Sequence, residues 1–252
     1  DDMLKAVAVV SGNDAAVALA EHLAGSEEGF VEQMNQRAQQ LGCVNTHFAD
    51  ATGLSDLNHY SSAWDIYLIT RALMPYEKFM EICNSKSAEI AETDHNQRHV
   101  LHSTNRLISN WRELGYLYRD AQGIKTGSTP EAGYCLISSA LRGSRHMISV
   151  VLGAERVTLE DGVTILTRSF SETSRMFDWG FDNFVRRDVL SSADPVQEVP
   201  VALSSETNYV VAHAAEDISC LLPDNVEPEM LERTVTLTNE TVDAPVAAGD
   251  VL

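Results

Sequence analysis

Residues Ala121-Gln-Gly-Ile-Lys-Thr-Gly-Ser-Thr-Pro-Glu-Ala-Gly-Tyr134 lead into the part of the chain that decides the fold. Two apolar segments follow, Tyr134 to Leu141 and His146 to Leu152, and Arg142-Gly-Ser144 between them is typical of a hairpin turn. The sequence therefore predicts two antiparallel strands, with Lys125 before them on an edge strand that faces a cleft.

Apolar residues at helical spacing predict a helical block before residue 85. The first helix covers residues 13–24, and the second begins after the capping residue Ser26 and ends at Gly42. Ser62-Ala-Trp-Asp65 is a capping-box pattern that opens a third helix, which stops at Pro75.

A short fourth helix is predicted over residues 76–83, whereas residues 86–120 are polar and mixed and receive no assignment. After the hairpin, an apolar face at helical spacing predicts one long amphipathic helix. Its members are Val163, Leu166, Phe170, Phe177 and Phe181. Trp64 and Trp179, also in helical patterns, are expected in the core.

The character of the chain changes after Val189. Prolines interrupt short Val- and Thr-rich runs such as residues 199–202 and 234–238, which is typical of a small β-domain. We therefore expect one domain over residues 1–189 and a separate β-rich domain over residues 190–252.

Composition restricts the class of protein. The 252 residues are 44% hydrophobic and 22% charged, which lies in the ordinary globular range. A net charge of -19 argues against binding nucleic acid, because phosphate requires clustered Lys and Arg. No apolar run approaches the roughly 20 residues of a membrane-spanning helix.

Cysteine and histidine spacing favours neither a metal site nor a disulfide framework. The cysteines are far apart and include no Cys-x-x-Cys pair; they are Cys43, Cys83, Cys135 and Cys220. Cys135, inside an apolar strand pattern, is interpreted as a buried free thiol. The histidines between residues 95 and 102 are dispersed, and His47 and His59, without a partner motif, are interpreted as structural.

The residues Lys125-Thr-Gly127 form a short motif that indicates a chemical function. A Lys-Thr-Gly before an apolar strand is one of three motifs that active-site-serine penicillin-recognising enzymes share. Lys125 would supply an ammonium to a substrate carboxylate, and Thr126 a hydroxyl donor beside it. Gly127 has no Cβ, so a substrate could lie against the strand and form main-chain hydrogen bonds.

Ser11-Gly-Asn13 is a second of the three motifs, Ser-x-Asn, and it follows the apolar run Ala6 to Val10. We expect it at a strand-to-helix turn, where Ser11 can relay a proton and Asn13 can hold a substrate amide. Ser-x-Asn alone is equally typical of a helix cap, and a given tripeptide occurs by chance in about 5% of chains of this length. The order, separation and local context of the two motifs argue against coincidence.

The third motif, Ser-x-x-Lys with the nucleophilic serine, is absent. The lysines of the chain are Lys5, Lys78, Lys86 and Lys125, and the residues three positions before them are Asp2, Pro75, Cys83 and Gln122. The chain is either the later part of a longer protein or has lost the chemistry, and we favour a fragment. Its first residues show no signal-peptide pattern.

The chain resembles the D-alanyl-D-alanine carboxypeptidases of the low-molecular-mass penicillin-binding proteins, serine peptidase family S11. The resemblance covers most of residues 1–185, and the tail is similar to the β-rich second domain. The matching stretches begin at Val9, Phe30, Leu41, Asn45, Tyr60, Gly123, Ala132 and Trp179. Ser-Gly-Asn in place of Ser-Asp-Asn distinguishes the chain from class A β-lactamases.

The resemblance implies an α+β fold. It is the penicillin-binding, β-lactamase-like transpeptidase fold, without its N-terminal part and followed by a small β-rich domain. In the family, one oxyanion donor is the backbone amide just after Lys-Thr-Gly, which is Ser128 here. The threonine of that motif, Thr126, and an arginine before the final helix hold the terminal carboxylate. Arg168 is nearest to that arginine in sequence, with Arg156 second.

The activity implied is removal of the terminal D-alanine from peptidoglycan stem peptides through an acyl-enzyme, with β-lactam antibiotics as mimics and with no cofactor or metal. The family acts outside the cytoplasmic membrane, in the cell envelope, usually tethered by a C-terminal amphipathic helix that these residues do not contain. The alternatives are a β-lactamase or transpeptidase of the same superfamily, and a non-catalytic peptidoglycan-binding homologue.

Overall fold

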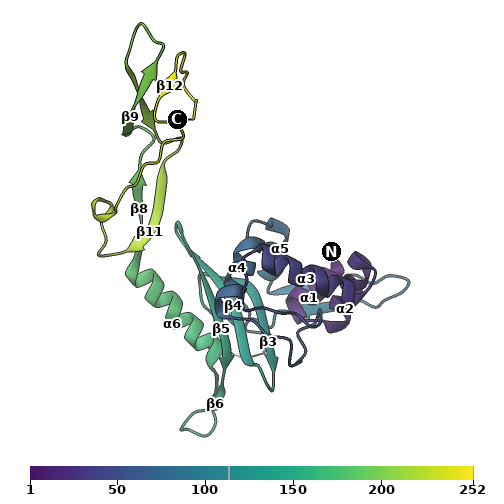
Figure 1. Ribbon diagram of the computed structural model, residues 1–252. Helices are drawn as coiled ribbons and strands as arrows, with labels where there is room; N and C mark the ends of the chain where they lie inside the picture. The colour runs from purple at the N-terminus through teal and green to yellow at the C-terminus, as the bar shows by residue number, and fades with distance from the viewer. Residues whose placement is uncertain (113, 252) are drawn as a thin grey trace. The chain divides into compact units, whose positions relative to one another are not determined.

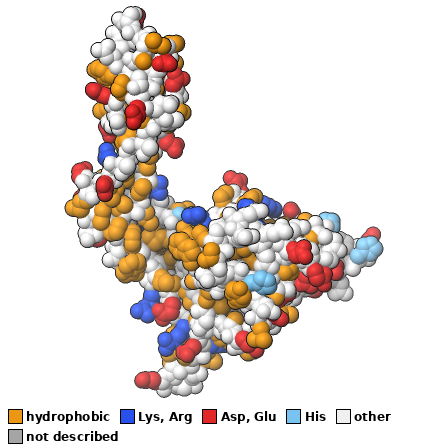
Figure 2. All heavy atoms as spheres, viewed as in Figure 1, with side chains coloured by type: hydrophobic (Ala, Val, Ile, Leu, Met, Phe, Trp, Pro, Cys, Tyr) orange, Lys and Arg blue, Asp and Glu red, His pale blue; other side chains and the backbone are white. Residues whose placement is uncertain are grey.

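A computed structural model describes residues 1–112 and 114–251 (Figure 1). The chain divides into two compact units, Asp1–Gly180 and Phe181–Leu252. Side chains of Asp and Glu occur at many places on both units on the face drawn in Figure 2, in agreement with the net charge of -19. Among the described helices, none is long and apolar enough to cross a membrane.

The first unit begins with a helical block. Its helices are α1 (Asp2–Val10), α2 (Asn13–Ala24), α3 (Glu27–Gln40), α4 (Ala63–Leu73) and α5 (Glu77–Cys83). The predicted caps are confirmed, because the Ser26 hydroxyl accepts from the Gly29 N–H at 3.0 Å and the Ser62 hydroxyl accepts from the Asp65 N–H at 3.1 Å. These bonds satisfy amides that a helix start otherwise leaves without a partner.

The apolar run Ala6 to Val10 is the end of helix α1, so the strand expected before Ser11 is wrong. A run this short has no period of its own and fits either element. Ser11 takes a left-handed conformation with φ 62°, its N–H donates to the Val7 carbonyl at 3.2 Å, and the Gly12 N–H donates to the Ala6 carbonyl at 3.0 Å. These bonds close helix α1, and the motif therefore lies at a helix-to-helix turn.

The predicted hairpin is confirmed as part of an antiparallel sheet of order β3-β4-β5. Its strands are β3 (Ala121–Thr129), β4 (Gly133–Arg142) and β5 (Arg145–Ala154). Strand β3 lies at the edge, in contact with α1 and α5, and α4 contacts β5 (Figure 1). Two small hairpins complete the strands of this unit: β1 (Ser87–Ile90) with β2 (His99–His102), and β6 (Arg156–Thr158) with β7 (Ile165–Thr167).

Helix α6 (Arg168–Asn183) runs beside β5, where the Ser149 hydroxyl donates to the Thr173 hydroxyl at 3.3 Å (Figure 1). Phe170 and Phe177 are buried, as predicted. Val163 and Leu166 are not in this helix, which corrects the longer helix expected from the sequence. The Asp161 carboxylate accepts from the N–H groups of Val163 and Thr164 and forms a turn there instead.

The two tryptophans expected in the core are exposed, Trp64 at 66% and Trp179 at 61%. Residues of a helix advance by about 100° each, so Trp179 lies on the face opposite to the buried Phe177 two positions earlier. Trp64 contacts the ring of Tyr67, with the ring centroids 5.2 Å apart, and remains on the surface. Helical spacing alone did not identify which face of each helix is buried.

The second unit is rich in strands. They are β8 (Phe184–Leu190), β9 (Pro195–Ala202), β10 (Tyr209–His213), β11 (Ile218–Pro223) and β12 (Val242–Asp243), with a 3-10 turn at Pro228–Met230. β8 pairs with β11, and β9 lies between β10 and β12. Residues 234–238, expected as a strand, are in no strand of the described structure. The unit begins at Phe181, and the domain boundary at residue 189 stays a prediction.

Candidate active site

The two motifs meet at one cavity of about 390 Å³ in the first unit. Its lining includes Ser11 and Asn13 from the turn between α1 and α2, and Thr126, Gly127 and Ser128 from β3. The cavity also borders the segment of residues 103–112 and the start of α6. The structure thus brings together residues that lie more than a hundred positions apart in the sequence.

Lys125 joins the two motifs directly. Its Nζ donates to the Ser11 hydroxyl at 2.9 Å and to the Thr126 carbonyl at 2.6 Å. The sequence assigned Lys125 to the substrate carboxylate, whereas in this structure its ammonium is directed at Ser11. An amine bonded to a hydroxyl can exchange a proton with it, so the arrangement is suited to a proton relay.

Burial lowers the pKa of Lys125 from its ordinary value, because water no longer solvates the ammonium. The neighbouring Cys83 opposes that shift. The Cys83 thiol is itself buried, and burial raises its pKa to about 11. At neutral pH this thiol is therefore uncharged, and Lys125 holds its proton less firmly than an exposed lysine does.

Gly127 lies on the edge strand β3 with open space beside it. A Cβ built on Gly127 would have no atom of the described structure within 4 Å. The packing of the fold therefore does not require glycine at this position. Because Gly127 lines the cavity on an edge strand, a side chain here would obstruct only a molecule bound along that strand.

The segment of residues 103–112, which the sequence left without an assignment, supplies another part of the cavity lining and is hydrogen-bonded to β3. The hydroxyls of Thr104 and Thr126 are hydrogen-bonded at 2.6 Å, and the Thr104 N–H donates to the Val9 carbonyl at 3.2 Å. Thr104 therefore fixes the Thr126 hydroxyl. No motif marks this segment, and its one local signal is the adjacent apolar pair Leu107 and Ile108 between polar residues.

Asn105 holds that segment in place. Its side chain is 2% exposed, its Nδ2 donates to the Gly123 carbonyl at 2.5 Å, and its Oδ1 accepts from the Leu107 N–H at 3.0 Å. The Ser138 hydroxyl donates to the same Gly123 carbonyl at 2.6 Å. Asn105 therefore ties the loop to β3 just before Lys125.

The arginines at the cavity are not those predicted. Arg106 and Arg112 line it, together with Thr167 and Ser169. Arg168 is exposed and, among the described residues, is outside this lining; its N–H donates to the Glu155 carbonyl at 2.9 Å.

Two further sequence expectations concern residues near the cavity. Arg156 lies on β6 and lines a neighbouring groove. Cys135, predicted to be buried, is half-exposed and lines the active-site cavity from β4. Its position is opposite Gly127 in the pairing of β3 with β4.

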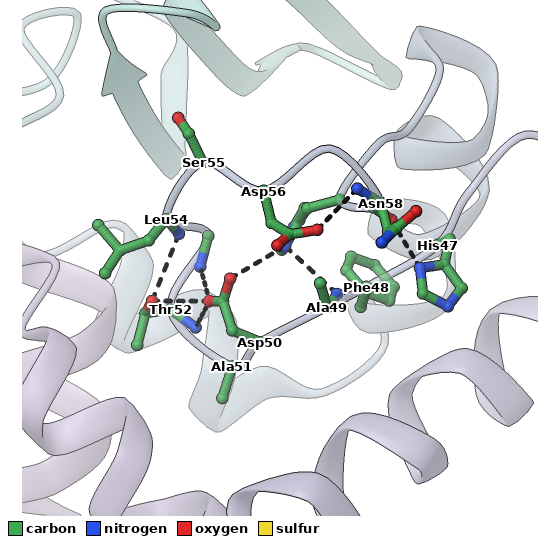
Figure 3. Close-up of polar contacts among 12 residues, drawn as sticks. His47, Phe48, Ala49, Asp50, Ala51, Thr52, Leu54, Ser55, Asp56 and Asn58 are labelled. Atoms are coloured by element: carbon green, nitrogen blue, oxygen red, sulfur yellow. Dashed lines mark hydrogen bonds and ion pairs between the residues drawn. The ribbon is translucent and has the colours of Figure 1, made fainter.

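A second polar cluster lies in the loop that precedes α4 (Figure 3). The Asp50 carboxylate accepts from the N–H groups of Thr52 and Gly53, and its other oxygen lies 3.2 Å from His59 Nδ1. His47 Nδ1 lies 2.6 Å from the Asn58 carbonyl. Both histidines therefore order the loop.

The tip of this loop reaches the end of β3. The Ser55 hydroxyl contacts the Thr129 hydroxyl at 2.8 Å and the Glu131 carboxylate at 2.7 Å. The loop is thus attached to the strand that carries Lys125. Within residues 1–112 and 114–251, no group of three or more His, Cys, Asp or Glu side chains could hold a metal ion.

Comparison with known proteins shows which family and which relatives this chain is similar to. The family model described as D-alanyl-D-alanine carboxypeptidase, Peptidase S11, matches residues 1–156. D-alanyl-D-alanine carboxypeptidase DacF of Bacillus subtilis is 32% identical over 251 residues, which are 100% of this chain and 60% of DacF. DacA of Escherichia coli is 35% identical over 251 residues, with 99% of this chain and 57% of DacA covered.

Solved structures agree with these matches. Penicillin binding protein 5 from Haemophilus influenzae aligns with a TM-score of 0.73 at 32% identity, over 99% of this chain and 66% of that structure. PBP3 from Streptococcus pneumoniae, a peptidoglycan synthesis regulatory factor, aligns with a TM-score of 0.72 at 24% identity, which supports the fold alone. The expected α+β fold is confirmed. The chain spans about 60% of the length of the curated relatives that it matches.

Proposed function

The chain belongs to the D-alanyl-D-alanine carboxypeptidase family of serine peptidases, S11, and we propose that the whole protein removes the terminal D-alanine from peptidoglycan stem peptides through an acyl-enzyme. The hydrogen bond between Lys125 and Ser11 carries this proposal. It joins two motifs 114 positions apart at a cavity that is also lined by Thr126. The residues 1–252 contribute this part of the site, and a Ser-x-x-Lys pair, absent from them, would contribute the nucleophile.

The proposal gives a role to each of these residues that lines or faces the cavity. Lys125 and Ser11 relay the proton that the leaving amine requires, because the ammonium donates to the hydroxyl at 2.9 Å. Asn13 holds a substrate amide, and the backbone N–H of Ser128 stabilises the oxyanion. Gly127 leaves space for the substrate main chain along β3.

The Thr126 hydroxyl, fixed by Thr104, binds the terminal carboxylate of the substrate. The sequence also predicted that Arg168 binds this carboxylate. No contact supports that role, since Arg168 lies outside the described lining of the cavity. No step of this proposal requires a cofactor or a metal.

The location and partners follow from the same proposal. A protein that trims stem peptides works outside the cytoplasm, in the cell envelope, and binds β-lactam antibiotics in the same cavity. Residues 1–189 would form the peptidase domain and residues 190–252 a β-rich domain without a catalytic part. Nucleic acid is not a partner, because the net charge of -19 repels phosphate.

The experiment measures D-alanine release from a peptide that ends in D-Ala-D-Ala. In the whole protein, Lys125→Met should lower kcat by about 10²–10⁴-fold, the usual contribution of a group that transfers a proton. Lys86→Met, at an exposed position away from the cavity, is the matched control and should leave the rate unchanged. Equal rates for the two variants would contradict the proposal.

Two alternatives predict different results. A β-lactamase or a transpeptidase of the superfamily would hydrolyse the penicillin acyl-enzyme rapidly or transfer the peptide to an amine. A non-catalytic homologue would bind muropeptide without acylation. The rate at which a penicillin adduct forms and disappears separates these cases from a carboxypeptidase, which forms the adduct and loses it slowly.

A further inference from the structure

The active-site cavity continues into a second groove at the end of strand β3. The groove, of about 850 Å³, shares Ser128 and Tyr134 with the cavity. The rest of its lining comes from the turn of residues 129–133 between β3 and β4, and from residues 153–157 of β5 and β6. Neither of the two motifs contributes a residue to this groove.

The proposed function determines which part of a substrate reaches the groove. Thr126 is assigned to the terminal carboxylate and the Ser128 N–H to the carbonyl of the bond that breaks, so the peptide runs along β3 toward Thr129. An extended peptide advances about 3.3 Å per residue, as does the strand beside it. The residue that precedes D-Ala-D-Ala therefore lies at the turn of residues 129–133.

That turn presents a carboxylate. Glu131 is exposed and lines the groove. We propose that Glu131 binds an amine on the side chain of the residue that precedes D-Ala-D-Ala, and that it thereby favours peptides in which this side chain is cationic. This inference rests on the proposed function, and it concerns a part of the substrate that the two motifs do not contact.

Glu131 is held in place by contacts from two segments. The hydroxyl of Ser55, at the tip of the loop in Figure 3, donates to the Glu131 carboxylate at 2.7 Å. The same hydroxyl lies 2.8 Å from the Thr129 hydroxyl, which accepts from the Ala132 N–H at 3.0 Å. Pro130 restricts the turn further, because its ring fixes φ. A side chain anchored in this way loses less conformational entropy when it binds a ligand.

The charge of the groove favours a cation over an anion. Its charged lining residues are Glu131, Glu155 and Arg156, so carboxylates outnumber guanidinium groups. The bond from Ser55 lowers the pKa of Glu131 from its ordinary value, and the carboxylate is therefore charged at neutral pH. An ammonium gains a charge-assisted hydrogen bond there, whereas an acetylated amine gains only a neutral one.

The test uses the whole protein and two peptides that end in Lys-D-Ala-D-Ala, one with a free side-chain amine and the other acetylated at that amine. The wild type should favour the free amine in kcat/KM by about two- to fivefold, the factor of an exposed ion pair. Glu131→Gln should abolish this preference by slowing the free-amine peptide alone, and Glu131→Lys should reverse it. In about 1 M salt, which screens charges beyond about 3 Å, the wild type should also lose the preference.

Glu160→Gln is the matched control, because it removes one negative charge at an exposed position outside the described lining of the groove. It should keep the wild-type preference. Equal changes for Glu160→Gln and Glu131→Gln would overturn the inference, since they reflect overall charge. An equal loss for Glu131→Gln on both peptides would also overturn it, since that pattern reflects a displaced turn. Glu131→Gln keeps an oxygen that can accept from Ser55, so the turn should survive.

Failure of the proposed function gives a different pattern. If the wild type releases no D-alanine from either peptide, that function is wrong, and calorimetric binding of the two peptides then tests Glu131 by itself. Tighter binding of the free amine that Glu131→Gln abolishes supports the inference. Equal binding or no binding refutes it. Release of D-alanine from both peptides at equal rates refutes the inference and leaves the proposed function intact.

Discussion

Asn105→Ala is the change that tests most closely how the loop of residues 103–112 is held. The substitution removes the acceptor of the Leu107 N–H and one of two donors to the Gly123 carbonyl. A buried N–H left without a partner costs about 1–3 kcal/mol, and loss of one hydrogen bond costs about 1 kcal/mol. The expected destabilisation is therefore about 2–4 kcal/mol.

The matched control is Ser138→Ala, which removes the other donor to the Gly123 carbonyl. That carbonyl keeps its bond from Asn105, and no N–H is left without a partner, so the cost should be about 1 kcal/mol. The assay is calorimetric unfolding, since it can resolve separate transitions for the two units. For a unit of this size, Asn105→Ala should lower the melting temperature by about 5–15 °C.

The activity of Asn105→Ala should fall with its stability. Thr104 and Arg106 flank Asn105, and both lose their fixed position when the loop is released from β3. The reasoning is refuted if Asn105→Ala melts at or above the temperature of Ser138→Ala. It is also refuted if Asn105→Ala releases D-alanine at the wild-type rate.

Gly127→Ala should keep the wild-type melting temperature within about 2 °C, since no described atom lies within 4 Å of the new Cβ. The same variant should lower the rate of penicillin acylation by at least about tenfold. A change in stability with normal acylation would contradict this prediction. Ser11→Gly should be more stable than Ser11→Ala by about 1 kcal/mol because φ is 62° there, and both should lose D-alanine release equally through loss of the hydroxyl. Unequal activities of these two variants would show that the backbone, not the hydroxyl, matters. Lys125→Met should raise the melting temperature at neutral pH, because the folded state disfavours the ammonium and binds its proton less tightly than the unfolded state. The free energy of unfolding of the wild type then rises as the pH approaches 10.5, so the difference in melting temperature between Lys125→Met and the wild type should shrink over that range. A constant or growing difference would contradict a lowered pKa of Lys125.

Features that depend on residue types and on contacts between residues close in the sequence could be predicted. The caps at Ser26 and Ser62 depend on one hydroxyl and an amide three residues later, so they are visible in the chain itself. The hairpin of residues 133–154 was equally clear from its two apolar strands and short turn. The motif residues Ser11 and Lys125 were identified by type and order, and the structure places them 2.9 Å apart.

Features that depend on tertiary contacts could not be predicted. Helix α1 was mistaken for a strand, because five apolar residues fit both elements until the left-handed Ser11 closes the helix. Arg106 was missed because its position depends on Asn105 and Thr167, which lie far apart in the sequence. Arg168 was chosen by its place before the final helix, but at the start of α6 it is exposed, whereas its neighbours Thr167 and Ser169 line the cavity.

We propose that these residues form the substrate side of a penicillin-binding active site whose nucleophile they do not contain. Intact-mass spectrometry after incubation with fluorescent penicillin tests this proposal, on residues 1–252 alone and after addition of a segment that carries Ser-x-x-Lys from a member of the family. We expect no adduct on residues 1–252 alone and one acyl group on the serine of the added segment. A stoichiometric adduct on any serine within residues 1–252 would refute the proposal.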